Sequence, residues 1–394
     1  MTNSQPALTP PMGWNSWRAF GDNPLGEKVS ERNICETADI LVAMGYKDAG
    51  YQYVVIDDHW HGGRDKSGVL YPHPKRFPNG MKAIADYVHG KGLKFGIYSD
   101  AGNKTCGGEP GSYGYEEQDA KTFASWGVDF LKYDYCYAPE NYKTAIRRYK
   151  KMGDALRKTG RPIVYSICEW GERSPWLWGA ACGGYMWRVS FDLGARWDTP
   201  QNSNRGIGIL TAIDRMTGLE RFAGPGNWND PDMLNVGFSR RGEKCTDVEW
   251  RSHVSMWSML AAPLIIGSDI RHLNEKTRSI LLNTEVIAVD QDSKGMQGIR
   301  ICRTGQSEIW RKNLTGGRIA VAFFNRGEAP AKITATRDEL EIPPDMTIKI
   351  RELWKHEELG FMEDRFTADT APHEVIMVIL TPNVTIRNKG KESK

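Results

Sequence analysis

The sequence predicts an α/β protein, a (β/α)8 TIM barrel followed by a C-terminal antiparallel β-sandwich domain. Between about residues 10 and 290, eight short β-type runs alternate with amphipathic helical stretches, the pattern of parallel βα units. After about residue 295, the pattern changes to short runs of alternating polarity, separated by turn residues. We therefore expect a barrel at 8–295, a sandwich at 296–385 and a polar tail at 386–394.

The eight predicted strands are spaced by roughly 24 to 42 residues, which is the length of a βα unit with its loop. They are expected to end near Trp17, Asp58, Asp100, Asp134, Cys168, Asp192, Asp232 and Asp269. The helical patterns between them include 27–45, 79–90 and 117–126. The predicted sandwich strands include 307–313, 318–326, 331–337, 347–353 and 373–382.

Charge, hydropathy and cysteine content limit the partners and the compartments that the sequence allows. A net charge of +3 over 394 residues, without a basic run, argues against a nucleic-acid partner. The longest apolar stretch, Met256 to Gly267, is too short to span a membrane. The first ten residues are polar and lack a signal-peptide core, so the protein is cytoplasmic unless an export signal has been removed. Seven cysteines leave at least one thiol unpaired within the chain, and their spacing fits no zinc ribbon.

Reacting groups of a TIM barrel lie at the C-terminal ends of its strands, and six of the eight predicted ends carry an aspartate. Some of these aspartates are expected to cap helices. Lys132 and Asp134 point the same way by strand alternation, so the ammonium is expected to hold Asp134 ionised, as a nucleophile requires. Asp192 follows Arg188 two strands further on. Two carboxylates about 5 Å apart would predict glycoside hydrolysis with retention.

Asp57 and Asp58 end the second strand, where alternation sends one inward and the other towards the loop. Paired carboxylates there can bind vicinal sugar hydroxyls or a metal ion, and His59 and His61 follow them. Because no other predicted strand end carries a histidine, a metal-dependent barrel hydrolase is disfavoured. We expect no metal and no cofactor, and we expect both histidines to lie in a solvated loop.

Several motifs, in order, resemble the retaining α-galactosidases of glycoside hydrolase family 27. They are GWNSW at 13–17, IDDHW at 56–60, GIYSDAGNKTC at 96–106, DAKTFASWGVDFLKYDYC at 119–136, CEW at 168–170 and AGPGNWNDPDM at 223–233. The resemblance covers roughly residues 8 to 300. It implies a (β/α)8 barrel with a β-sandwich and removal of terminal α-galactose by double displacement.

The resemblance also implies roles for single residues. Asp134 matches the nucleophile and Asp192 the acid/base, while Arg188 and Lys132 match ligands of sugar hydroxyls. Further matches are Asp57 and Asp58 for the 4- and 6-hydroxyls, Trp17 and Tyr98 for the walls, and Asp232 with Met233 for the lip near the 2-hydroxyl. A carboxylate aimed at the axial 4-hydroxyl would be left unpaired by glucose, which is strong discrimination.

The cysteines partly depart from the family pattern. Cys106 and Cys136 match a disulfide pair of the family, which favours an oxidising compartment and hence a secreted or periplasmic protein. His59 stands where relatives usually carry a cysteine, which leaves Cys35 free. Cys168 either pairs with Cys182 or stays reduced at the pocket wall. The two others, Cys245 and Cys302, are expected to be small buried hydrophobes.

Substrate choice within the family rests on the loop at Cys168, Glu169 and Trp170. This loop looks filled, so a plain 2-hydroxyl is favoured over a 2-acetamido group. Asp58 leaves space and a partner for the 6-hydroxyl, which β-L-arabinopyranosides lack. The expected substrate is therefore a small-molecule α-galactoside, with arabinopyranosidase and α-N-acetylgalactosaminidase as alternatives. A non-catalytic carbohydrate-binding barrel is disfavoured because both acids are present. The aglycone and the oligomeric state stay open.

Overall fold

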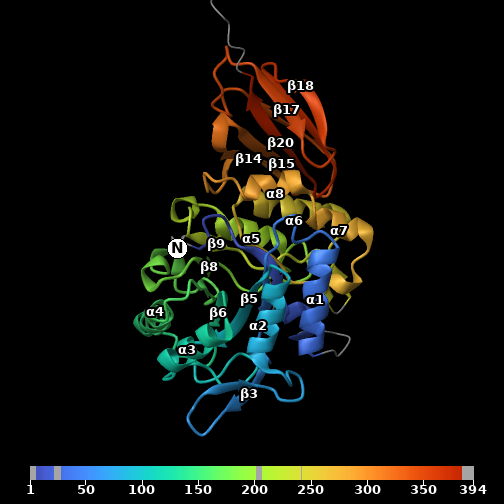
Figure 1. Cartoon of the computed structure of the whole chain (residues 1–394). Coiled ribbons are helices and arrows are strands. Elements are labelled where there is room, and N and C mark those ends of the chain that lie inside the picture. The colour runs from blue at the N-terminus through green and yellow to red at the C-terminus, as the bar shows by residue number, and fades with distance from the viewer. Residues whose placement is uncertain (1–5, 22–27, 201–205, 241, 384–394) are drawn as a thin grey trace, which may run out of the picture.

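A computed structural model describes residues 6–21, 28–200, 206–240 and 242–383 of the chain. It shows a barrel of parallel strands and helices, with an antiparallel β-domain at one side (Figure 1). The predicted fold class is therefore confirmed. The predicted polar tail at 386–394 lies outside the described residues, as does the start of the predicted helix at 27.

Eight parallel strands form the barrel, and each predicted strand has a counterpart among them. Their bounds are β1 (Met12–Asn15), β2 (Tyr53–Ile56), β5 (Lys94–Asp100), β6 (Phe130–Asp134), β7 (Val164–Ile167), β8 (Met186–Arg188), β9 (Trp228–Asp230) and β12 (Leu264–Ile266). The strand order is β12-β1-β2-β5-β6-β7-β8-β9. Leu234, just after β9, closes the ring through a parallel bridge with Ile266, and its N–H donates to the Ile265 carbonyl at 2.7 Å.

Helices follow the strands and cover the outside of the barrel (Figure 1). They are α1 (Glu31–Ala43), α2 (Gly80–Gly90), α3 (Glu116–Trp126), α4 (Tyr142–Lys158), α5 (Ile209–Met216), α6 (Asp247–Met259), α7 (Glu275–Leu281) and α8 (Thr284–Asp290). The first three match the predicted helical patterns. Thr246 and Glu249 form a reciprocal capping box at the start of α6, which satisfies two backbone donors there.

Smaller elements lie in the connecting loops. The short strands are β3 (His61–Arg64), β4 (Leu70–Pro72), β10 (Ser239–Arg240) and β11 (Glu243–Lys244). The short helical turns are η1 (Trp17–Gly21), η2 (Pro175–Leu177), η3 (Ala180–Cys182), η4 (Glu220–Phe222), η5 (Ile270–His272) and η6 (Thr315–Gly317). The turn η1 begins where the sequence predicted the first strand to end.

The inside of the barrel changes from apolar to polar along the strands. One apolar cluster includes Phe130, Val55, Val164 and Met186, all buried. Because side chains alternate across a strand, residues two and four positions further on face the same interior. On β6 the series runs from Phe130 through Lys132 to Asp134, in register with Gly96, Tyr98 and Asp100 of β5. The apolar cluster thus forms the floor beneath a polar barrel mouth.

The C-terminal domain is an antiparallel β-sandwich. Its six-stranded sheet has the order β13-β14-β15-β20-β17-β18, and a two-stranded sheet pairs β16 with β19. The bounds are β13 (Ile299–Thr304), β14 (Ser307–Asn313), β15 (Ile319–Asn325), β16 (Ala331–Thr336), β17 (Ile348–Glu352), β18 (Glu357–Phe361), β19 (Arg365–Thr370) and β20 (Val375–Pro382). The domain packs against α6, where the buried Lys312 donates to the Ser258 carbonyl at 2.8 Å (Figure 1).

A helix that crosses a bilayer needs about 20 mostly apolar residues. In the part of the chain that the structure describes, no helix combines the length and the apolar character needed to cross a membrane.

Candidate active site

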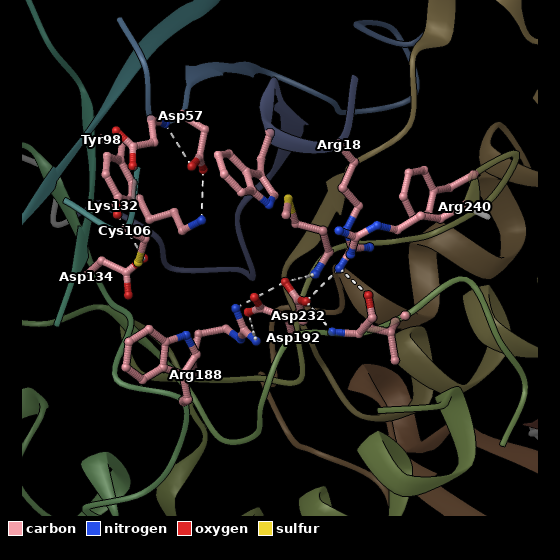
Figure 2. A pocket seen from close by; sticks show the side chains of 17 residues that line it. Arg18, Asp57, Tyr98, Cys106, Lys132, Asp134, Arg188, Asp192, Asp232 and Arg240 are labelled. Carbon is pink, nitrogen blue, oxygen red and sulfur yellow. Dashed lines mark hydrogen bonds and ion pairs between the residues drawn. The ribbon is translucent and has the colours of Figure 1, made fainter. Parts of the chain in front are cut away.

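A pocket of about 100 Å³ opens at the C-terminal ends of the barrel strands (Figure 2). Its wall includes twelve residues singled out from the sequence: Trp17, Asp57, Asp58, Tyr98, Cys106, Lys132, Asp134, Trp170, Arg188, Asp192, Asp232 and Met233. These residues come from loops and strand ends far apart in the chain. The TIM-barrel rule that reacting groups gather at this face therefore locates the pocket correctly.

Asp134 ends β6 and is held at the bottom of the pocket. Its Oδ2 accepts from the Tyr98 hydroxyl at 3.0 Å, and its Oδ1 accepts from the Tyr135 N–H at 3.1 Å. Burial raises the Asp134 pKa to about 6; the Lys132 charge lowers it and the Asp192 charge raises it further. At neutral pH the carboxylate is still mostly ionised.

Lys132 lowers the Asp134 pKa, as expected, but it is not the only group that acts on this carboxyl. The Lys132 ammonium pairs with Asp57 Oδ2 at 2.8 Å, and its side chain is mostly buried. Burial of Asp134 outweighs the lowering effect of Lys132 on its pKa. Lys132 therefore forms an ion pair with Asp57 and acts on Asp134 through its charge.

Asp192 lies in the loop after β8, and its surroundings differ from those of Asp134. Its side chain is 63% exposed, and its Oδ1 accepts from Arg188 Nη2 at 3.1 Å. Asp134 is only 5% exposed. Two carboxyl groups in unlike environments on one pocket can take different roles, one as nucleophile and one as proton carrier.

Asp57 and Asp58 both line the pocket, so the expectation that alternation would send one of them into the loop is wrong. The reason is that β2 ends at Ile56, before the pair, and the chain turns there. Asp57 Oδ2 accepts from Asn15 at 2.7 Å, in addition to Lys132. The two oxygens of Asp58 accept from the backbone N–H groups of His59 at 2.7 Å and Gly107 at 2.8 Å. Both carboxylates are thus held in fixed orientations, with acceptor capacity left for a ligand.

Asp232 is held by two arginines opposite this pair. Its Oδ2 accepts from Arg18 Nη2 and from the Leu193 N–H, both at 2.7 Å, and Arg188 Nη1 lies 3.2 Å from Oδ1. Burial by itself would raise the Asp232 pKa, but Arg188 and Arg18 outweigh it, and the pKa is lowered. Asp232 is therefore a fixed negative charge beside Met233.

Three non-glycine residues around the pocket have a positive φ angle. The angles are 69° at His59, 58° at Trp170 and 93° at Asp232. Such conformations cost about 1–3 kcal/mol each and persist where surrounding contacts hold them. Their position in three loops of one pocket indicates that the rim is held in shape by its hydrogen bonds.

The two histidines after Asp58 differ, and the expected solvated loop is wrong for His61. His61 is 2% exposed and stacks on Trp60 with ring centroids 3.9 Å apart. Burial lowers the His61 pKa well below its usual value, so the ring is neutral. His59 is partly exposed and stacks on Trp17 at 5.8 Å.

A metal site has little support in the described ranges. There, one cluster has ligand-like spacing, formed by Asp100, Cys106, Asp134 and Cys136. Its two cysteines are joined in a disulfide, so they offer no thiolate to a metal ion. Asp100 already accepts from the Cys136 N–H at 2.9 Å. The disulfide and Asp100 therefore form a structural link between two rim loops.

The predicted disulfide between Cys106 and Cys136 is confirmed. Cys106 lies at the pocket wall, with its Sγ 3.5 Å from Asp134 Oδ2. Of the two alternatives for Cys168, the structure has the unpaired one, because Cys168 and Cys182 are both free. The remaining cysteines are also free: Cys35 as expected, Cys245 buried as expected, and Cys302 only half-buried.

Two residues expected to contact the sugar, Cys168 and Glu169, do not line the pocket. Cys168 is buried beside Arg188, with Sγ 3.8 Å from Nη1. Glu169 turns away and accepts from the backbone N–H of Arg173 at 2.9 Å. Burial raises its pKa to about 7 despite Arg173. Glu169 thus fixes the turn that presents Trp170 to the pocket.

Five further pocket residues were missed: Arg18, Leu193, Gly194, Phe238 and Arg240. Arg18 offered a signal, since it is a charged residue directly after the aromatic end of the first motif. Arg18 reaches the pocket because the chain coils through η1 after β1. The other four lie in long loops, whose paths local sequence patterns do not define.

Comparison with known proteins decides the family. A family model described as alpha galactosidase A matches residues 9–292, and one described as the alpha galactosidase C-terminal beta sandwich domain matches 304–380. The chain belongs to the α-galactosidase family, glycoside hydrolase family 27. The resemblance deduced from the motifs is confirmed, and the family match covers both structural parts of the chain.

Individual relatives agree with the family. An alpha-galactosidase A of Cellvibrio japonicus is 49% identical over 82% of this chain and 78% of its own. The crystal structure of alpha-galactosidase I from Mortierella vinacea superposes with a TM-score of 0.90 at 38% identity, covering 96% of this chain and 98% of its own. A β-L-arabinopyranosidase of the same family from Geobacillus stearothermophilus has a TM-score of 0.82 at 28% identity, with 96% and 98% covered.

Proposed function

We propose that the protein is a retaining exo-glycosidase that removes terminal non-reducing α-D-galactose from oligo- or polysaccharides. The observation that carries this proposal is the pocket itself, which is lined by two carboxyl groups in different environments, Asp134 and Asp192. At its inner end, Asp57 and Asp58 offer fixed acceptors to sugar hydroxyls. Membership of the α-galactosidase family supports the choice of sugar.

In the first step, Asp134 attacks the anomeric carbon while Asp192 donates a proton to the departing glycosidic oxygen. The C–O bond to the aglycone breaks, and a galactosyl ester of Asp134 forms. The developing positive charge on the sugar is stabilised by the buried Asp134 carboxylate before the bond forms. Exposure of Asp192 lets it meet a leaving group at the open side of the pocket.

In the second step, Asp192 takes a proton from water, and that water attacks the anomeric carbon of the ester. Asp134 leaves as a carboxylate and Asp192 regains its proton, so the enzyme returns to its starting state. Two inversions at one carbon give net retention. The first released sugar is therefore expected to be the α-anomer.

Selection of galactose is assigned to the inner end of the pocket. Asp57 and Asp58 are expected to accept from the 4- and 6-hydroxyls, with Lys132 donating beside them. Glucose would place its 4-hydroxyl elsewhere and leave one acceptor site of a buried carboxylate unfilled, at a cost of about 1–3 kcal/mol. Arg188 and Asp232 lie at the opposite wall, where they are expected to meet the 2-hydroxyl.

Two activities of the same family are the alternatives: α-N-acetylgalactosaminidase and β-L-arabinopyranosidase. Trp170 lines the pocket, and we expect its ring to take up the room that a 2-acetamido group would need. The arabinopyranosidase is 28% identical, compared with 49% for the Cellvibrio alpha-galactosidase A. Both observations favour the α-galactoside.

The test is a kinetic comparison of p-nitrophenyl α-D-galactoside, α-N-acetylgalactosaminide and β-L-arabinopyranoside. We expect kcat/KM to be highest for the galactoside, and NMR of early product to show α-galactose. Failure to hydrolyse the galactoside, or β-galactose as first product, would overturn the proposal.

We also propose that the chain folds in an oxidising compartment and is secreted or periplasmic. The Cys106–Cys136 disulfide at the pocket wall supports this, since such bonds are rare in reducing compartments. Alkylation of the protein from its own host, followed by mass spectrometry, should find both thiols blocked from reagent until a reductant is added. Free thiols at both positions would contradict the proposal.

A further inference from the structure

A second, larger hollow of about 850 Å³ adjoins the sugar pocket on its open side. The two share five residues of wall: Trp170, Asp192, Leu193, Gly194 and Arg240. Asp192 and Arg240 are both visible at the pocket in Figure 2. The expected proton donor therefore lies on the border between the two spaces, with the small pocket on one side and the hollow on the other.

Phe191 lines the hollow but not the sugar pocket. It directly precedes Asp192, and 48% of its surface is exposed. Among the described phenylalanines, only Phe361 of the distant strand β18 is also strongly exposed, at 55%. An exposed aromatic ring next to a proton donor offers a flat apolar face to whatever is attached to the oxygen that is protonated.

The charges of the hollow narrow the kind of ligand. Glu140, Glu172 and Glu243 contribute negative charge, while Arg196 and Arg240 contribute positive charge. Arg196 and Glu243 form an ion pair with each other. Mixed signs favour neither an anion nor a cation. Carboxylate and guanidinium groups beside an aromatic ring fit a neutral sugar, which has hydroxyls at its edge and an apolar C–H face.

We infer that Phe191 is a specificity-determining residue and forms the platform for the sugar unit that leaves with the glycosidic oxygen. This inference rests on the proposed function, because Asp192 as proton donor defines which side of the bond faces the hollow. The preferred substrate class is then an oligosaccharide whose galactose is linked to another neutral sugar, rather than a galactoside with a small leaving group.

The test compares melibiose, which releases glucose, with α-D-galactosyl fluoride, whose leaving group is too small to reach the ring. In Phe191→Ala, the ratio of kcat/KM for melibiose to kcat/KM for the fluoride should fall about 10-fold, the effect of losing roughly 50 Å² of apolar contact. Phe361→Ala removes a similarly exposed ring far from the hollow and should leave the ratio at the wild-type value.

Two further variants separate the effect of the aromatic face from the effect of side-chain bulk. Phe191→Tyr keeps the aromatic face and should keep the ratio within about two-fold, whereas Phe191→Leu keeps bulk without the face and should lower it. An unchanged ratio in Phe191→Ala and Phe191→Leu, with wild type active on both substrates, overturns this inference alone. Wild type inactive on both substrates overturns the proposed function, and this inference with it.

Discussion

Buried charges gather in two regions of the molecule, the barrel mouth and the contact between barrel and sandwich. At the mouth, Asp57, Asp134 and Asp232 face a cavity. At the contact, Glu308 is fully buried and accepts from Arg300 at 2.9 Å, from Arg326 at 3.0 Å and from the Trp310 indole at 2.8 Å. Each region places carboxylates beside arginine or lysine, yet only the mouth leaves room for a ligand.

The difference shows what separates a structural charge cluster from a reactive one. Besides Glu308, Arg326 donates to both carboxylate oxygens of Asp214 in α5, at 2.7 and 2.8 Å. It therefore connects the sandwich to the barrel. Every strong partner of this cluster is another side chain. At the mouth, Asp134 accepts from the Tyr98 hydroxyl and the Tyr135 N–H, and it keeps acceptor capacity towards the cavity. The open space, rather than burial or charge, identifies the functional region.

The largest effect is expected at Asp134. Asp134→Asn should lower kcat on p-nitrophenyl α-D-galactoside by about 10⁴-fold or more, because the amide cannot form the galactosyl ester. Asp269→Asn is a matched control, because Asp269 also follows a barrel strand but caps η5 and lies outside the pocket. Full turnover by Asp134→Asn, or an equal loss in the control, would contradict the assigned role.

A smaller loss is expected at Asp192. Asp192→Ala should lower kcat/KM for melibiose by about 10²–10⁴-fold, because glucose leaves poorly without a proton. The loss on 2,4-dinitrophenyl α-D-galactoside should be much smaller, since that group leaves unprotonated. Equal losses on the two substrates would contradict the role of Asp192 as acid. Asp192 would then no longer differ from Asp134 in the step that it serves.

At the interdomain contact, a change should affect stability rather than chemistry. Glu308→Ala leaves Arg300 and Arg326 without their buried partner and should lower the free energy of unfolding by about 3–5 kcal/mol. Urea unfolding followed by tryptophan fluorescence measures this loss. KM for the aryl galactoside at 25 °C should stay unchanged in the folded fraction. A shift in KM with unchanged stability would show that Glu308 acts on the pocket rather than on the interdomain contact.

The smallest effect concerns pH. Burial raises the Asp134 pKa to about 6, so protonation as pH falls through about 6 should remove the nucleophile. Below that value, kcat/KM should fall about 10-fold per pH unit. Glu308→Gln should leave the position of this acid limb unchanged, because Glu308 lies outside the pocket. If kcat/KM began to fall only below pH 4, burial would not determine the pKa of Asp134.

The sequence predicts the scaffold well because its signals are local. Apolar runs ending in aspartate mark the barrel strands, and the run 130–134 coincides with β6. The family resemblance also implies Trp17 and Tyr98 as pocket walls, and both line the pocket. Strand alternation fails at Asp58, because a strand that has already ended no longer alternates.

Features set by tertiary contacts could not be predicted in this way. His61 is a polar residue that local patterns place in solvent, yet the hairpin β3–β4 buries it against Trp60. Glu169 lies next to a pocket residue in sequence, but Arg173 draws its carboxylate away from the pocket. The positive φ of Asp232 depends on hydrogen bonds from residues 39 and more positions distant, such as the Leu193 N–H.

The way the barrel closes has a practical consequence. Leu234 joins the two ends of the ring, with the Gly267 N–H donating to its carbonyl at 3.0 Å. The same short loop carries Asp232 and Met233. A sugar bound against them would therefore stabilise the hydrogen bonds that close the barrel. Deuterium uptake at the amides of Leu234 and Gly267 should slow when galactose is added, while uptake in the middle of β6 stays constant. These two amides would then report occupancy without any chromogenic substrate or label on the protein.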